Sequence, residues 1–330
     1  IDHVTTGHAY YLTENLNSFT VPDGVNLTLC LNGHTISACY NGPTIEVKPG
    51  ATLTLCNCKS GGYITHSNSA RGAGVFVGQK DDSMTGTGKN SAVFHMYGGI
   101  IGGNSDGATK TKEYIYGSGV VVMGGTFYMY GGTITQNWGD DSRNDYAGGV
   151  YVSGTGSFHM LGGKITRNNF TDSRPNDPHI SGVLVATGGT ITLSRDADIS
   201  DNGTMDDIYL CNDVKIAIGE GGLTGSNRSY IRLQYAPAYR SGETVEITYP
   251  TGTDVSGHFR GGGPGCIINE RPSDHVVLVT AGQDWGLKVT MTPKTLTLAQ
   301  GTSGTLTAKP DCNTAHDRAY QWFQNTQDSI

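Results

Sequence analysis

Two segments of the sequence carry the same acidic and basic residues in the same order, and these side chains suit acid–base chemistry. The matching residues are Asp141-Ser142-Arg143 and Asp172-Ser173-Arg174, with a further aspartate, Asp145 or Asp177, in each segment. If the segments lie on neighbouring layers of a stacked sheet, equivalent atoms are about 4.8 Å apart. Carboxyl groups about 5–5.5 Å apart are typical of retaining glycosidases, whereas inverting glycosidases need about 6.5–9.5 Å. The four aspartates are therefore candidate catalytic residues for glycoside hydrolysis.

The charges around these aspartates leave two interpretations open. Two carboxylates this close cannot both ionise easily, so one would act as an acid and the other as a nucleophile. Arg143 and Arg174 oppose this division, because they stabilise both anions. Asp, Ser and Asn are also turn-forming residues, and Asp-Ser-Arg can be an Asx-turn with a surface ion pair. The two segments are thus either a catalytic pair or two structural turns.

Aromatic residues accompany the charges in three long insertions. The insertions are Ser105–Ser118, Trp138–Gly148 and Asn169–Ser181. Loops on a rigid scaffold are the usual place for function, and aromatic rings in polar loops are costly unless they pack or bind a ligand. The expected substrate-binding residues are Tyr116, Trp138, Arg143, Tyr146, Tyr151, Arg174 and His179. We expect Trp138 to be partly exposed and to line a groove with Tyr151 and Asp172.

A repeat predicts the elements that position these residues. Three segments share the pattern Phe-x-Met-x-Gly-Gly-x-Ile, and an asparagine follows each of them at the same distance. The segments begin at Phe94, Phe127 and Phe158, and their asparagines are Asn104, Asn137 and Asn168. A weaker fourth copy runs from Ile191 to Asn202, and the four asparagines are 33, 31 and 34 residues apart. A third strand recurs between the copies, for example at Val120–Val122 and Val150–Val152. This spacing predicts a solenoid with three short strands in each rung.

The repeat predicts an all-β chain in two parts. Residues 1–286 should form a right-handed parallel β-helix, and residues 287–330 the start of an immunoglobulin-like β domain. Phe and Met two residues apart point to the same side of a strand, so stacked rungs give apolar ladders. We expect each asparagine to take a left-handed turn and to bond the asparagines above and below, while paired glycines form another corner. An immunoglobulin-like sandwich needs about 100 residues, so further domains of the same parent chain are expected.

The repeat pattern and two other segments resemble a known group of proteins. The segments are YYLTENLNSFTVPDGVNLTLCLNGHTI, from Tyr10, and IEVKPGATLTL, from Ile45. Over roughly residues 8–285 the chain resembles the pectate-lyase-like β-helix repeats of surface proteins from gut Firmicutes. That group includes glycosidases, lyases and adhesins, among them β-helix glycoside hydrolases similar to the bacterial lacto-N-biosidases. The resemblance implies a secreted or cell-surface bacterial protein with an oligosaccharide or glycan as its ligand.

Two outward-facing stripes of the predicted strands carry apolar and aromatic residues. The first stripe is Phe76, Val121, Tyr151, Leu184 and Tyr209, and the second is His95, Tyr97, Tyr128, Tyr130, His159 and Leu161. The first is either the floor of a sugar-binding groove or a surface that loops or another domain cover. The second is interpreted as cross-strand packing, because Tyr128 interrupts any histidine ladder that could bind metal. Asp206 and Asp213 flank one strand as a weaker second carboxylate pair.

Composition excludes several partners. The net charge is −7 and no cluster of Lys and Arg stands out, which argues against nucleic acid as a ligand. No apolar run reaches the ~18 residues of a membrane span, so no membrane insertion is expected. Cys30 and Cys56 should stack in adjacent rungs, and a disulfide such as Cys39–Cys58 is one open pairing. The spacing of Cys56 and Cys58 is not that of a zinc site, and no metal or cofactor is expected.

Two functions of different classes remain. The first is a retaining glycoside hydrolase that acts on host or plant oligosaccharides through the paired aspartates. The second is a non-catalytic glycan-binding adhesin or surface stalk module, which the immunoglobulin-like continuation favours. A lyase is a third possibility, but its acidic polymer substrate fits a net charge of −7 poorly.

Overall fold

The structure is a computed structural model. The chain forms two compact units, Ile1–Gln283 and Asp284–Ile330. It describes residues 7–67, 70, 72–79, 90–104, 119–138, 147–168, 182–203, 207–234, 243–262, 266–281, 289–292 and 307–310. Almost all of the regular structure in these residues is β-strand, with a single turn of 3-10 helix, η1 (Ser256–His258).

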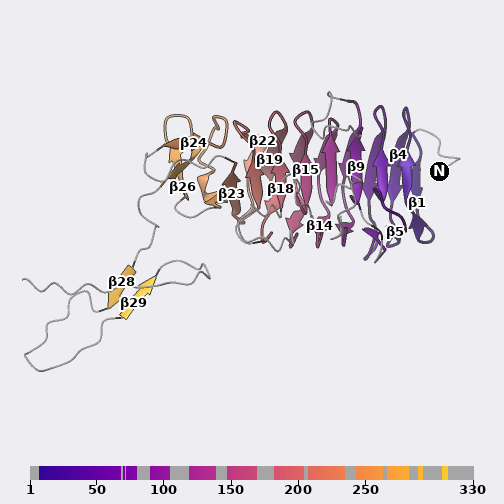
Figure 1. Ribbon diagram of the computed structural model, residues 1–330, viewed down its shortest axis with the longest axis horizontal. Helices are drawn as coiled ribbons and strands as arrows, with labels where there is room; N and C mark the ends of the chain where they lie inside the picture. The colour runs from indigo at the N-terminus through magenta and orange to yellow at the C-terminus, as the bar shows by residue number, and fades with distance from the viewer. Residues whose placement is uncertain are drawn as a thin grey trace, which may run out of the picture. The chain divides into compact units, whose positions relative to one another are not determined.

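Three parallel sheets run along the first unit, with strands that lie side by side from the indigo to the orange end of the ribbon (Figure 1). The first sheet contains β1 (Ala9–Tyr11), β4 (Asn26–Cys30), β7 (Thr52–Cys56), β10 (Val93–Met96), β13 (Thr126–Met129), β16 (Ser157–Met160), β19 (Thr190–Arg195) and β22 (Ile216–Leu223). The second contains β2 (Leu16–Asn17), β5 (Thr35–Ala38), β8 (Tyr63–His66), β11 (Ile100–Gly102), β14 (Thr133–Thr135), β17 (Lys164–Thr166) and β20 (Asp198–Ile199). The third contains β3 (Phe19–Val21), β6 (Ile45–Val47), β9 (Val75–Gly78), β12 (Val120–Met123), β15 (Val150–Val152), β18 (Val183–Val185), β21 (Ile208–Leu210), β23 (Ser229–Leu233) and β25 (Phe259–Gly261). The chain thus forms a parallel β-helix with three strands per rung, as the repeat predicts.

The interior is filled by ladders of identical side chains. Phe127 pairs in register with Phe94 on one side and Phe158 on the other, and all three rings are fully buried. Their centroids are 4.9 and 5.0 Å apart with nearly parallel planes, which matches the spacing of stacked strands. Met129 forms an equivalent buried ladder two residues later. These contacts confirm the predicted apolar ladders.

The corners of the rungs confirm one part of the prediction and correct another. Gly132, of a repeated glycine pair, has φ of 86°, and a Cβ there would lie 2.6 Å from the Met96 methyl group and 2.8 Å from a carbonyl oxygen. The prediction that the asparagines take the left-handed turn is wrong. The residue before each asparagine does so instead: Gly103, Gln136, Arg167 and Asp201 have φ between 55° and 72°. The turn residue redirects the chain, so the asparagine that follows can point its amide into the interior.

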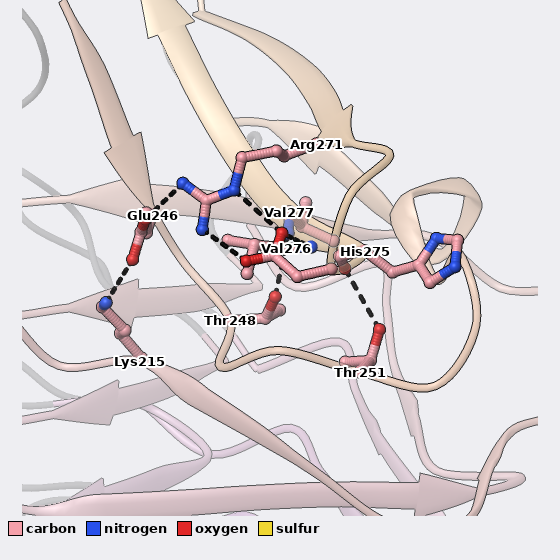
Figure 2. Close-up of polar contacts among 9 residues, drawn as sticks. Lys215, Glu246, Thr248, Thr251, Arg271, His275, Val276 and Val277 are labelled. Atoms are coloured by element: carbon pink, nitrogen blue, oxygen red, sulfur yellow. Dashed lines mark hydrogen bonds and ion pairs between the residues drawn. The ribbon is translucent and has the colours of Figure 1, made fainter.

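The C-terminal end of the first unit changes to antiparallel pairing. β24 (Thr244–Glu246), β27 (Val276–Ala281) and β26 (Cys266–Arg271) form an antiparallel sheet, which we call the terminal sheet. Lys215 donates to Glu246 at 2.5 Å, and Arg271 binds Glu246 at 2.7 Å (Figure 2). Arg271 also binds Asp274 at 2.8 Å. The ion pairs thus link the terminal sheet to the residue that precedes β22.

The second unit contains one described pair of antiparallel strands, β28 (Val289–Thr292) and β29 (Thr307–Pro310). All of its other residues lie outside those that the structure describes. The immunoglobulin-like identity of this unit therefore stays a prediction.

Candidate functional site

A line of buried asparagines occupies the corner from which the three insertions leave the rungs. Asn104, Asn137, Asn168 and Asn202 are at most 1 % exposed. At each of the three steps, the side-chain Nδ2 of one asparagine donates to the Oδ1 of the next at 2.9 Å. The backbone N–H of the same residue donates to that same oxygen at 3.1–3.2 Å. This asparagine line confirms the predicted stacking, and all of its donors point the same way along the solenoid.

The orientation of each amide in the line follows from its main-chain partners. The Oδ1 of Asn137 accepts a backbone N–H from Asn104, while its Nδ2 donates to the carbonyl oxygen of Ile101 at 3.1 Å. A reversed amide would place its nitrogen against an N–H and its oxygen against a carbonyl. The line therefore has a fixed direction, with a donor needed at one end and an acceptor at the other.

A polar side chain contacts the line at each end. At the first end, the Nδ1 of His66 lies 2.7 Å from the Oδ1 of Asn104. At the other end, Oδ1 of Asp207 accepts from the backbone N–H and the Nδ2 of Asn202, both at 3.0 Å. Its Oδ2 accepts from the backbone N–H of Tyr230 at 2.8 Å. Burial raises the pKa of Asp207 to about 6, although the hydrogen bonds from Tyr230 and Asn202 act to lower it.

A polar pocket of about 280 Å³ opens beside Asp207, where the asparagine line ends. Its lining residues are Ser200, Asp201, Asn202, Gly203, Asp207, Ser226, Asn227, Arg228, Tyr230 and Arg260. The Arg260 guanidinium lies 5.5 Å from the centroid of the Tyr230 ring and donates to the phenol oxygen at 3.3 Å. The pocket therefore offers cationic donors, carboxylate and hydroxyl acceptors and one aromatic ring.

The pocket lies next to the root of the third insertion. Asn202 stacks directly on Asn168, and the third insertion begins immediately after Asn168. Only residues 203–206 separate Asn202 from Asp207, whereas residues 169–181 separate Asn168 from Gly182 in the preceding rung. The segment that follows the asparagine is thus much shorter in the rung where the pocket opens.

Most of the predicted site residues fall outside the described part of the chain. They are Tyr116, Asp141, Arg143, Asp145, Tyr146, Asp172, Arg174, Asp177 and His179, together with Asp206 of the weaker pair. The roots of their loops are described. Asn137 and Asn168 are hydrogen bonded, and Gly149 at the far end of the second insertion donates to Gly182 at 3.1 Å. The second and third insertions therefore begin and end in register on adjacent rungs.

Trp138 and Tyr151 are the two predicted binding residues that the structure describes. Trp138 is partly exposed, as expected, and its backbone N–H donates to Asn104 at 2.8 Å. Tyr151 is only 4 % exposed. It belongs to a second apolar cluster that contains the whole first stripe, Phe76, Val121, Tyr151, Leu184 and Tyr209, packed with Ala73, Met123 and Ala147. The five side chains of the stripe are at most 8 % exposed, so the stripe is buried and is not an open groove floor.

The second outward stripe packs along the first sheet. The Tyr128 ring stacks between His95 at 5.0 Å and His159 at 4.7 Å, and Tyr97 stacks on Tyr130 at 4.5 Å. Because the interplanar angles are 13° or less, the ring faces contact one another. This geometry is that of cross-strand packing. Among the described residues, no group of three His, Cys, Asp or Glu side chains is arranged to hold a metal ion.

Sequence reasoning missed the pocket and both ends of the asparagine line. Nothing in the repeat pattern distinguishes Asp207 from a turn residue before a strand, and Arg228, Tyr230 and Arg260 stand outside the pattern. One signal was present: the insertion after the fourth asparagine is far shorter than the three before it. A short connection that follows longer insertions in the preceding rungs is where a depression should form.

Comparisons with known proteins identify no relative of this chain: no family model, no curated protein and no solved structure matches it. A separate search of the described residues reveals no helix with the length and apolar character needed to cross a membrane.

Proposed function

We propose that the chain is a glycan-binding solenoid of a secreted or cell-surface protein, and that the pocket beside Asp207 holds one end of the oligosaccharide. The observation that carries this proposal is the lining of the pocket. Sugar hydroxyl groups both donate and accept hydrogen bonds, and the lining supplies guanidinium donors with carboxylate, hydroxyl and amide partners. Its volume of about 280 Å³ is near the lower limit of about 300 Å³ for small-molecule sites, which favours a single sugar unit over a long segment.

The side chain of Tyr230 gives the sharpest test of this proposal. In a screen of mucin-type, milk and plant oligosaccharides, Tyr230→Ala should weaken binding by about 1–3 kcal/mol, as for an aromatic residue central to a binding site. Tyr249→Ala is the matched control, because Tyr249 also carries a cation over its ring, Lys215 at 5.8 Å, but does not line the pocket. Unchanged affinity in a folded Tyr230→Ala protein would refute the assignment of the pocket.

A retaining glycoside hydrolase is the second candidate, and the register of the insertions favours it. Asp141 and Asp172 each follow the asparagine of their rung by four residues, and those asparagines are hydrogen bonded. Equal offsets from stacked residues are what a pair of carboxyl groups about 5 Å apart requires. Asp141→Asn and Asp172→Asn should each reduce the release of sugars by orders of magnitude, with little change in melting temperature. Full activity in both variants would show that these aspartates are not catalytic, whereas no release of sugars by the native protein would leave the chain as a binding module.

A further inference from the structure

Three thiols lie together where the first sheet turns toward the second. Cys30 and Cys56 are the last residues of β4 and β7 and pair in register, and Cys58 follows two residues later. The Sγ atoms of Cys30 and Cys58 are 2.9 Å apart. The Cys56 thiol instead points toward the carbonyl oxygen of Leu29, at 3.7 Å. Of Cys56 and Cys58 in the adjacent rung, Cys58 is the one whose sulfur contacts the sulfur of Cys30.

The environment of the pair suits reaction with a dissolved reagent. Cys58 is exposed and Cys30 is partly buried, so a small molecule can reach them. A disulfide bond is about 2.0 Å long, and closing it from the observed contact needs a movement of only about 1 Å. Cys39, which the sequence offered as a partner of Cys58, is exposed, and the contact of Cys58 is with Cys30.

We propose that Cys30 and Cys58 form an oxidisable pair, which a low-molecular-weight disulfide converts into a covalent bridge between two adjacent rungs. The Cys30 thiolate attacks one sulfur of the reagent and releases one thiolate, leaving a mixed disulfide on Cys30. The Cys58 thiol loses its proton to solvent, attacks the Cys30 sulfur and releases the second thiolate. The reagent gains two electrons and two protons and leaves as two thiols, while the two cysteines lose them.

Electrostatics assigns different roles to the three thiols. Burial raises the pKa of Cys30, but hydrogen bonds from the Cys58 thiol and from the backbone of Asn32 and Cys58 outweigh burial and lower the pKa below its ordinary value. Burial and the charge of Cys30 raise the pKa of Cys56 to about 11, so Cys56 stays protonated. Since the thiolate is the nucleophile, Cys30 attacks first and Cys56 takes no part.

The bridge would close a loop between residues 28 positions apart and tie the rung of β4 to the rung of β7. Loops of this length give a substantial loss of unfolded-state entropy, so oxidation should raise the melting temperature by about 4–10 °C. The pair lies several rungs from the pocket beside Asp207, so this inference stands or falls independently of glycan binding.

Peptide mapping of the protein treated with oxidised glutathione tests the proposal. Chymotrypsin cuts after Leu31 and so separates Cys30 from Cys39, and a cross-linked peptide that joins Cys30 to the segment with Cys58 is expected. Cys39→Ser and Cys56→Ser are the matched controls and should retain this peptide and the rise in melting temperature. Cys58→Ser should lose both. The proposal is overturned if all thiols remain open to alkylation after treatment, or if the bridge persists in Cys58→Ser through Cys56 or Cys39.

Discussion

A single carboxyl group, that of Asp207, accepts the last hydrogen bonds of the asparagine line. The amide of each asparagine accepts a hydrogen bond from one neighbour and donates one to the other, so each asparagine needs an acceptor in the next rung. An ionised carboxylate only accepts, so it satisfies the final donors without needing a further partner. The cost is the burial of a charge, which is what raises the pKa of Asp207 to about 6.

This burial makes the stability of the protein depend on pH in a defined direction. The pKa of Asp207 is about 6 in the folded protein against an ordinary value of 3.8, so the folded state binds the proton more tightly between these limits. The stabilisation of the folded state by protonated Asp207 is fully present below the pKa of this residue in the unfolded chain. It is lost as the pH rises through the pKa in the folded protein. Its size is on the order of 2–3 kcal/mol. Urea unfolding at pH 4–7 should show that the stability of the native protein relative to Asp207→Asn falls by about this amount. A difference that is independent of pH would contradict the assignment.

At the scale of the strands, the sequence predicts what repeats and misses what does not. Phe127 and Met129 recur with their equivalents at a fixed offset from an asparagine, so their register and burial could be read directly from the spacing. The burial of Tyr151 could not be read from the spacing, because alternation places this side chain on the outer face of the third sheet and does not indicate that the face is covered. The left-handed turn was placed one residue late, since spacing fixes the corner but not which of two neighbouring residues takes the positive φ. The end partners His66 and Asp207 lie where the repeat stops, and so no repeated pattern marks them.

The phenylalanine ladder predicts a large effect for one substitution. Phe127→Ala should lower the free energy of unfolding by about 3–5 kcal/mol, because the rings of Phe94 and Phe158 hold both walls of the resulting cavity. Tyr97→Ala is the control, since Tyr97 lies on the outer face of the same sheet and is 53 % exposed. Chemical denaturation measures both variants. Equal and small losses would contradict the description of the ladder as the core.

At the scale of the whole first unit, stability should be local along the solenoid axis. Each rung pairs with its two neighbours, so an end rung has one open side unless something covers it. At the C-terminal end, the backbone N–H of Ile216 bonds the carbonyl oxygen of Ile247 at 2.8 Å, just after β24. The ion pairs of Glu246 with Lys215 and Arg271 are drawn in Figure 2, and Lys215 and Glu246 directly precede Ile216 and Ile247. The terminal sheet is therefore joined to the last strand of the first sheet by both backbone and charge.

Breaking the charge link should loosen this end of the protein and leave the other unchanged. Glu246→Gln removes the carboxylate that Lys215 and Arg271 share, and these two cations then face each other without their common anion. We expect faster hydrogen exchange in β24, β26, β27 and β22, with unchanged exchange in β4 and β7, because contacts in a solenoid pass only between neighbouring rungs. The difference should shrink at high salt, which screens these partly exposed charges. Glu220→Gln, an exposed carboxylate on β22 itself, is the control and should leave exchange unchanged. Faster exchange spread evenly over all rungs would show instead that the first unit opens as one cooperative body.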